Sequence, residues 1–166
     1  MANEEDFNSL DHVREGCELL KKHIDNNNII YLPVDPDADG YTSASLFYNY
    51  LVEVLNYPKE QIIYHIPEGK EHGLSTIIDW FPSDGSNKLI VAIDSSSNNY
   101  EEHQKLSNRG YDILVVDHHE ADKYSENAVV INNQLSEKYG NKMASGVGVI
   151  YKFFECWESI YGGQSA

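Results

Sequence analysis

Three short apolar segments of this sequence each end in a group of acidic or histidine residues, and this repeated pattern limits the fold more than any other feature. The segments are residues 29–34, followed by DPDADG, residues 89–93, followed by Asp94, and residues 113–116, followed by DHH. Apolar runs of this length are typical of buried strands. In a sheet that alternates with helices, ligands bind at the carboxyl ends of the strands. We therefore expect one sheet edge to collect these side chains, which are Asp35, Asp37, Asp39, Asp94, Asp117, His118 and His119.

The rest of the chain alternates between helix and strand patterns. Apolar residues at helical spacing occupy residues 10–24, 42–55 and 145–160, a polar helix is expected at 100–108, and a short helix is expected around 77–81. Two further strands are predicted at 61–66 and 128–131. This alternation predicts an α/β fold, with a five-stranded, mostly parallel sheet and helices on both faces.

The composition fits one globular domain and excludes several other classes of protein. At 166 residues and 41% apolar content, the chain can bury the core of a single domain. It has no run of 18 or more apolar residues and no secretory signal, so we expect a cytoplasmic protein without a membrane span. Cys17 and Cys156 belong to no CxxC or paired spacing, and both are expected to be reduced packing residues.

The net charge restricts how the chain can bind nucleic acid. A formal charge of −15 argues against a freestanding nucleic-acid-binding module, because such modules neutralise phosphates with Lys and Arg. Any long polyanionic substrate must then be held mainly by metal ions, by helix N-termini or by a part of the protein outside this sequence.

The acidic run after the first predicted strand indicates a metal centre. Alone, Asp35, Asp37 and Asp39 could form only an acidic turn before a helix. Two further strand ends with similar chemistry favour a divalent ion, since clustered carboxylates repel one another unless they are neutralised. Carboxylates mixed with imidazoles suit Mn²⁺ or Mg²⁺ best, with Zn²⁺ and Fe²⁺ as alternatives. Two ions about 3.5 to 4 Å apart would form a phosphoesterase site, with Asp94 as the bridging ligand.

Other candidate residues have both a structural and a functional interpretation. Of His118 and His119, one is expected to bind metal and the other to face substrate phosphate or orient a ligand, since neighbours on an extended segment point apart. Ser145, Gly146 and Gly148 fit either a helix cap with close packing or a phosphate cradle at a helix N-terminus. His72, beside Gly73, is a weaker candidate for a substrate loop.

These motifs resemble those of the DHH phosphoesterase family, and most of all its RecJ-type single-strand-specific DNA exonucleases. VDPDADGYTSASL is similar to the first family motif, LIVAIDSSS to the second and ILVVDHHEAD to the third, and HGLS and ASGVGVIYKF are similar to further RecJ segments. The resemblance runs through nearly the whole chain. It implies that the metal ligands are Asp35, Asp37, Asp94 and His118, that His119 faces the substrate, and that Asp117 and Asp39 are supporting acids. It thereby predicts catalytic roles for His119, Asp94 and Asp117.

Two departures from the family pattern affect the interpretation. The branch acting on oligoribonucleotides and cyclic dinucleotides usually has a ligand histidine four residues before the first aspartate, where this chain has Tyr31. The family also has a metal-binding aspartate on a strand beyond the SGVG helix, and no aspartate follows Asp122 here. We therefore expect residues 1–166 to be a single DHH catalytic domain, truncated before that motif and before the DHHA1-type C-terminal domain.

Three functions remain open at this point. The first is metal-dependent phosphodiester hydrolysis by a RecJ-like single-stranded DNA exonuclease with a two-metal Mn²⁺ or Mg²⁺ site. The second is a phosphodiesterase for short oligonucleotides or cyclic dinucleotides, and the third is a non-catalytic replisome scaffold of the same fold. The expected partners are single-stranded nucleic acid or a short oligonucleotide, with replication or repair proteins as further candidates.

Overall fold

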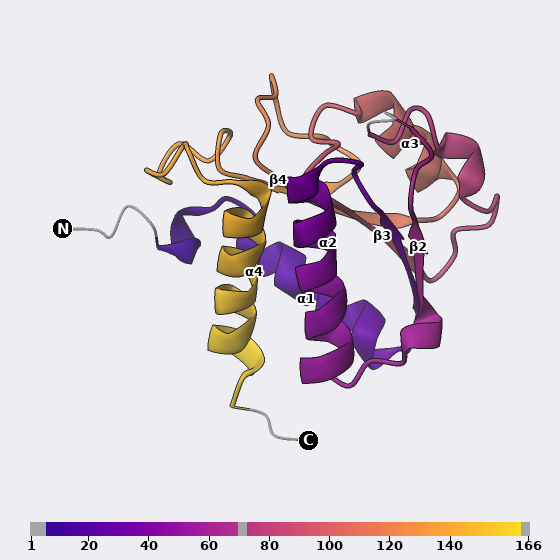
Figure 1. The fold of residues 1–166 in the computed structure, drawn as a ribbon, viewed down its shortest axis with the longest axis horizontal. Helices are drawn as coiled ribbons and strands as arrows, with labels where there is room; N and C mark the ends of the chain where they lie inside the picture. Colours follow the sequence, from indigo (N-terminus) through magenta and orange to yellow (C-terminus); the bar gives the residue numbers. More distant parts are fainter. Residues whose placement is uncertain (1–5, 70–72, 164–166) are drawn as a thin grey trace.

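Five parallel strands form one sheet at the centre of the molecule (Figure 1). The computed structural model describes residues 6–69 and 73–163. The order across the sheet is β2-β1-β3-β4-β5. The strand bounds are Ile29–Pro33 for β1, Ile62–His65 for β2, Lys88–Ile93 for β3, Asp112–Asp117 for β4 and Val129–Asn132 for β5. The predicted five-stranded sheet is confirmed, and every pairing in it is parallel.

Helices connect the strands and cover both faces of the sheet. The α-helices are α1 (Val13–Asp25), α2 (Ala38–Asn49), α3 (Tyr100–Asn108) and α4 (Gly146–Tyr161). Shorter helical turns are η1 (Phe7–Ser9), η2 (Tyr50–Val54, a π-helical turn that continues α2), η3 (Lys59–Gln61) and η4 (Ile78–Trp80). Figure 1 shows α1, α2 and α4 on one face of the sheet and α3 on the other.

Alternate side chains of the buried strands supply two separate cores, as the period of two in a strand requires. On the α1, α2 and α4 face, Phe47 and Phe153 pack in one cluster with Val91 and Leu114. On the α3 face, the core cluster includes Tyr31, Ile77, Phe81, Ile90, Ala92, Leu106, Tyr111 and Val115. The central strands are therefore buried on both faces, which explains why their sequences are continuous apolar runs.

Two helices differ from the sequence prediction at their ends. The prediction placed the second helix at 42–55, but α2 begins at Ala38 because Oδ1 of Asp37 accepts a hydrogen bond from the N–H of Gly40, at 2.7 Å, and caps the helix. The expected helix around 77–81 is only the short turn η4. The acidic run thus belongs partly to a helix N-terminus, and Asp39 lies in its first turn.

The order of the strands reverses between β1 and β3. From β1 the chain passes through α2 to β2 on one side, whereas β3, β4 and β5 follow on the other side. Such a reversal opens a crevice at the carboxyl ends of the two central strands, where α/β proteins bind ligands. The loops carrying Asp35, Asp37 and Asp94 leave β1 and β3 at this crevice.

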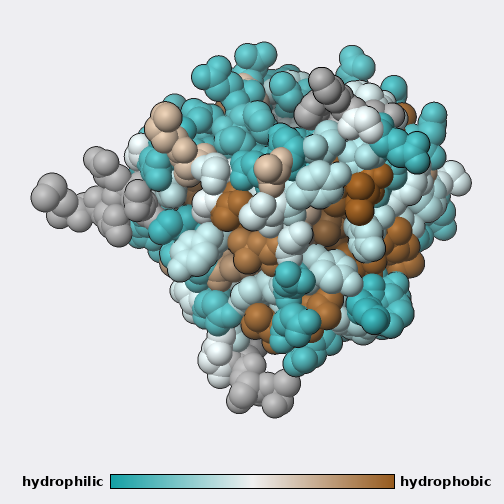
Figure 2. Space-filling model, in the orientation of Figure 1, coloured by the Kyte–Doolittle hydropathy of each residue, from teal (hydrophilic) through white to brown (hydrophobic). Residues whose placement is uncertain are grey.

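The surface is polar where those loops emerge. Figure 2 shows mostly hydrophilic residues at the upper end of this view, with apolar patches lower down and to the right. Within residues 6–69 and 73–163, no helix is long and apolar enough to cross a membrane. Cys17 and Cys156 are both buried free thiols, as expected.

Candidate metal centre

Carboxylates and imidazoles from three strand ends converge in two groups that share Asp94. One group is Asp35, Asp37 and Asp94, and the other is Asp94, Asp117, His118 and His119. Within each group, the candidate ligand atoms all lie within 4.8 Å of one another. Parallel neighbours in the sheet produce this convergence, since β1, β3 and β4 end at the same edge.

Asp94 occupies the centre of the site in an unusual backbone conformation. Its φ of 61° lies in the left-handed region, which costs a non-glycine residue free energy and often marks functional sites. Its side chain is 1% exposed, and burial together with the charges of Asp39 and Asp37 raises the pKa of the carboxyl to about 8. The geometry thus holds a carboxylate where burial and neighbouring negative charge oppose its ionisation, a conflict that a bound cation would relieve.

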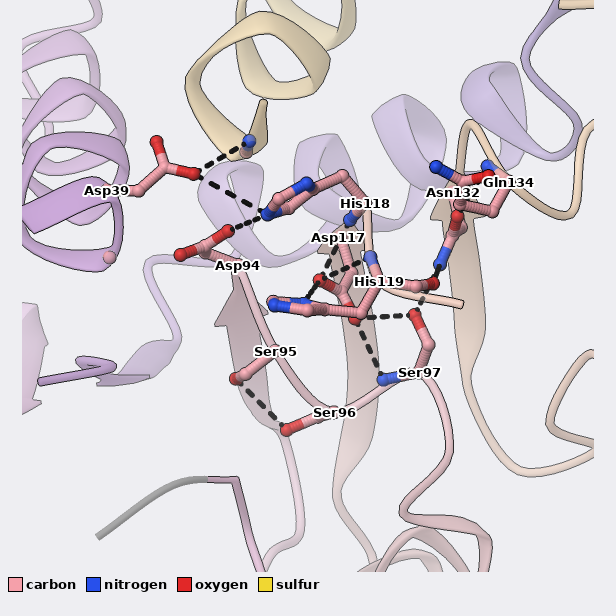
Figure 3. Close-up of polar contacts among 12 residues, drawn as sticks. Asp39, Asp94, Ser95, Ser96, Ser97, Asp117, His118, His119, Asn132 and Gln134 are labelled. Atoms are coloured by element: carbon pink, nitrogen blue, oxygen red, sulfur yellow. Dashed lines mark hydrogen bonds and ion pairs between the residues drawn. The ribbon is translucent and has the colours of Figure 1, made fainter. Parts of the chain in front are cut away.

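The contact between Asp94 and His118 has the character of two ligands facing one point. Nε2 of His118 lies 2.6 Å from Oδ1 of Asp94 and 3.5 Å from Oδ2 of Asp39 (Figure 3). Among the described residues, the buried Oδ1 of Asp94 has no partner with hydrogen-bond geometry. Two lone-pair donors that approach each other without a directed hydrogen bond suit a shared metal ion.

Asp117 is held differently, because it is surrounded by hydrogen-bond donors. Its Oδ1 accepts from Nδ1 of His119 at 2.6 Å and from the N–H of His118 at 2.8 Å, and its Oδ2 accepts from Oγ of Ser97 at 2.8 Å. Burial alone would raise the pKa of Asp117, but the bonds from His119 and Ser97 outweigh it and lower the pKa. The hydrogen bond between Nδ1 of His119 and Asp117 raises the pKa of His119 to about 9. Asp117 therefore orients the His119 ring rather than offering free ligand oxygens.

The three carboxylates that follow β1, those of Asp35, Asp37 and Asp39, make different contacts. Asp35 is 6% exposed and lines an open cleft of about 480 Å³ together with Asp37, Asp94 and His119. Asp37 also caps α2. Asp39 accepts a hydrogen bond from the N–H of Gly146 at 3.1 Å, which ties the start of α2 to the start of α4. The supporting place expected for Asp39 thus corresponds to a link between two helices beside the site.

The SGVG segment lies beside the metal centre as a helix start. Oγ of Ser145 accepts from the N–H of Gly148 at 3.3 Å and caps α4. A Cβ on Gly146 would lie 2.4 Å from Oδ1 of Asp94, so the absence of a side chain lets α4 approach the site. These contacts favour the interpretation as a cap with close packing, since Ser145 and Asp39 already occupy two of the first N–H groups. His72, the remaining candidate for substrate binding, lies outside the described residues.

Sequence reasoning missed the buried polar residues behind the histidines. Asn132, the last residue of β5, donates from Nδ2 to Oγ of Ser97 and to the carbonyl of His119, both at 2.8 Å (Figure 3). Ser97 and Asn132 are fully buried. The available signal was their position, since each follows a predicted strand in a polar triplet or pair, SSS and NN.

The donor set fits hard divalent cations. Asp35, Asp37 and Asp94 offer carboxylate oxygens and His118 offers an imidazole nitrogen, a combination suited to Mn²⁺ or Mg²⁺. Oδ1 of Asp94 is buried and accepts no hydrogen bond from the described residues, and this atom and the crowded negative charge around it are the structural observations that call for a cation there. His119 lies beside these four residues. Its Nδ1 is hydrogen-bonded to Asp117, and its ring lines the cleft.

Known proteins share both the sequence pattern and the fold. A Bacillus subtilis protein provisionally named as the SPbeta prophage-derived single-strand DNA-specific exonuclease YorK is 42% identical over 147 residues, covering 89% of this chain and 24% of that protein. The single-stranded-DNA-specific exonuclease RecJ of Bacillus subtilis is 27% identical over 144 residues, covering 84% of this chain and 18% of RecJ. The chain thus spans about a quarter or less of the length of these curated relatives.

Solved structures extend the likeness to the fold. A crystal structure of exonuclease RecJ bound to manganese superposes with a TM-score of 0.77 at 23% identity, covering 92% of this chain and 39% of that chain. RecJ from Thermus thermophilus in complex with Mn²⁺ gives a TM-score of 0.74 at 22% identity, covering 92% of this chain and 22% of that chain. The family model described as the DHH family, N-terminal domain, matches residues 27–165. The resemblance expected from the three acidic motifs is confirmed, and the chain belongs to the DHH family.

Proposed function

We propose that this chain is the catalytic DHH domain of a metal-dependent exonuclease that hydrolyses phosphodiester bonds of single-stranded DNA. The observation that carries the proposal is the convergence of Asp35, Asp37 and Asp94 with the DHH triplet at one sheet edge. Relatives named as single-strand DNA-specific exonucleases support the choice of substrate. Because the chain matches only a part of each relative, the proposal includes a contribution to the strand-binding groove from sequence beyond these 166 residues.

Each residue of the site has a part in the proposed reaction. Asp35, Asp37, Asp94 and His118 would hold two divalent ions, Mn²⁺ or Mg²⁺, with Asp94 between them. When bound, such ions supply a deprotonated water at neutral pH and neutralise charge on the phosphoryl oxygens. Asp117 accepts a hydrogen bond from Nδ1 of His119 and raises the pKa of its imidazole to about 9, so that Nε2–H of the charged ring would donate to a phosphate oxygen in the cleft.

A second substrate class is favoured by the charge of the chain. With a formal net charge of −15 and 12 Lys and Arg residues, the domain alone has little means of attracting a long polyanion. A short oligonucleotide or cyclic dinucleotide would need fewer phosphate contacts. Tyr31 weighs against this alternative, because it stands where the branch acting on such small substrates usually has a ligand histidine. Its side chain packs edge-on against Trp80, Phe81 and Tyr111 in the core and does not line the cleft.

The deciding experiment compares substrates in the presence of Mn²⁺. Labelled single-stranded DNA, duplex DNA, a dinucleotide and a cyclic dinucleotide are each incubated with the protein and with its Asp94→Asn variant. The proposal is supported if the native protein releases mononucleotides from single-stranded DNA and the Asp94→Asn variant does not. Faster turnover of dinucleotides would favour the second class. No turnover of any substrate, either by this chain or by a chimera that continues into the C-terminal part of YorK, would favour a scaffold. We further propose a cytoplasmic role beside DNA repair or replication proteins, which capture of such proteins by the tagged chain would test.

A further inference from the structure

A chain of buried hydrogen bonds connects the end of β5 to the second histidine of the DHH triplet. Asn132 is the parallel partner of Asp117 in the sheet and is fully buried. Its Oδ1 accepts from the N–H of Gln134 at 2.7 Å, which fixes the orientation of the amide. Both Nδ2 protons then have acceptors, which are Oγ of Ser97 and the carbonyl oxygen of His119. Every hydrogen-bonding direction of the Asn132 amide is thus determined.

Ser97 continues the connection with an equally determined direction. Its Oγ accepts from Asn132 and therefore donates its own proton to Oδ2 of Asp117, at 2.8 Å. The backbone N–H of Ser97 donates to the same oxygen at 3.2 Å. The other carboxylate oxygen of Asp117 accepts from Nδ1 of His119. Asn132 therefore reaches His119 twice, through its main-chain carbonyl and through Ser97 and Asp117 to its ring.

The His119 ring needs such support because packing restrains it little beyond a tilted contact with the His118 ring, at 4.4 Å between centroids. Its side chain is 52% exposed, whereas that of Asp117 is 1% exposed. A half-exposed imidazole can turn about its side-chain bonds unless hydrogen bonds restrict it. Figure 3 shows Ser97 and Asn132 on the side of Asp117 away from Asp94. Ser97 bonds to the Asp117 carboxylate and Asn132 to the His119 carbonyl, so their contacts act on the site through Asp117 and His119.

We propose that Asn132 and Ser97 are positioning residues, which hold the His119 ring in the cleft by fixing the Asp117 carboxylate and the His119 main chain. The inference about turnover rests on the proposed function, but the inference about the ring does not. Partners that orient site residues from behind typically change activity by about 10- to 100-fold when they are removed. The loops after β3, β4 and β5 are joined at this one point, so a change in any of them should reach His119.

Two substitutions test the connection, and each has a matched control. Ser97→Ala removes the hydroxyl between Asn132 and Asp117. Its control is Ser125→Ala, which removes a buried hydroxyl bonded at 2.8 Å to Nδ1 of His103 on the α3 side of the sheet. Asn132→Asp keeps the shape but sets an acceptor against the His119 carbonyl. Its control is Asn133→Asp, a neighbouring buried amide that donates to the carbonyls of Asn141 and Ala144 instead.

The first readout is the His119 ring itself, assigned by comparison with His119→Gln in nitrogen-15 spectra. The native protein should show a slowly exchanging Nδ1 proton, and both Ser97→Ala and Asn132→Asp should exchange it at least about tenfold faster. The two controls should leave it unchanged. Unchanged exchange in both test variants would overturn the proposal, as would equal acceleration in the controls.

The second readout separates the positioning role from the proposed function. On single-stranded DNA in Mn²⁺, kcat should fall about 10- to 100-fold in Ser97→Ala and Asn132→Asp. The Kd for Mn²⁺, measured by calorimetry, should change less than about threefold, since neither residue is a ligand. Absence of turnover by the native chain, both alone and when it continues into the C-terminal part of YorK, would contradict the proposed function, while the ring measurement would still decide the positioning role. A loss of Mn²⁺ affinity as large as the loss of kcat would contradict positioning through His119.

Discussion

Nε2 of His118 lies 2.6 Å from Oδ1 of Asp94, although the two residues follow different strands and are 24 positions apart in the sequence. The parallel pairing of β3 with β4 brings them together, and the N–H of Asp94 donates to the carbonyl of Val116 at 2.9 Å to fix the loop. This contact joins the motif that ends in Asp94 to the DHH motif in a single site.

Asp94→Asn should abolish hydrolysis and leave the fold intact or more stable without metal. The substitution removes one negative charge from a buried cluster that includes Asp37 and Asp39, and it removes the proposed bridging ligand. Thermal unfolding checks both effects. At a Mn²⁺ concentration 100 times Kd, the native protein should gain about 2.7 kcal/mol of stability, and the variant should gain much less.

The matched control for this change is Asp79→Asn, which alters an exposed carboxylate in η4. It should keep the native response to Mn²⁺. Mn²⁺-dependent turnover by the Asp94 variant would refute the bridging role.

Gly146→Ala should weaken Mn²⁺ binding, because its methyl group would lie 2.4 Å from Oδ1 of Asp94 and force α4 or the carboxylate to move. Overpacking of this kind costs about 1 to 3 kcal/mol. Gly148→Ala is the control, since its nearest neighbour would be 3.5 Å away and alanine favours a helix. Calorimetric titration with Mn²⁺ should show about a 5- to 150-fold higher Kd in the first variant only. Equal affinities would mean that α4 moves away at no cost to the site.

The sequence was sufficient to predict the sheet and the site edge, but not the contacts behind that edge. Apolar runs ending in acids are local signals, so residues 29–34, 89–93 and 113–116 indicated their strands directly. The partners of Asn132 lie 35 and 13 residues away, at Ser97 and His119. Asparagine after a strand is also an ordinary turn residue, so only the tertiary fold distinguishes the two roles. The early start of α2 was missed because Asp37 appeared as a ligand rather than also as a cap.

Stability should fall in acid partly because His103 is buried. Burial lowers the pKa of His103 to about 4, and its Nδ1 is bonded to Ser125. The unfolded chain, with a pKa near 6.5, binds the proton more readily. The contribution of neutral His103 is therefore complete above about pH 6.5 and is lost as the pH falls toward 4.

Denaturant unfolding of the native protein and of His103→Gln checks this contribution. Between pH 7 and 4.5, the native protein should lose about 2 to 3 kcal/mol more than the variant. His12→Gln, which removes a different histidine, is the control in this comparison. If the free energy of unfolding falls equally with pH in the native protein and in the His103 variant, His103 is protonated without unfolding and the prediction is wrong.

The 166-residue chain should bind Mn²⁺ but degrade single-stranded DNA poorly. It carries the convergent ligands of three motifs, yet no aspartate follows Asp122, and the chain matches only 24% of YorK and 18% of RecJ. Hydrolysis by two metals requires both ions in fixed relation, and a formal charge of −15 gives the strand no continuous basic track. A chimera that continues into the C-terminal part of YorK should therefore release mononucleotides faster than the 166-residue chain does, because it would complete the metal site and add contacts to the strand. The chimera with Asp94→Asn is the control, and it should be inactive. Equal turnover by the 166-residue chain and the chimera would mean that the three motifs suffice for catalysis.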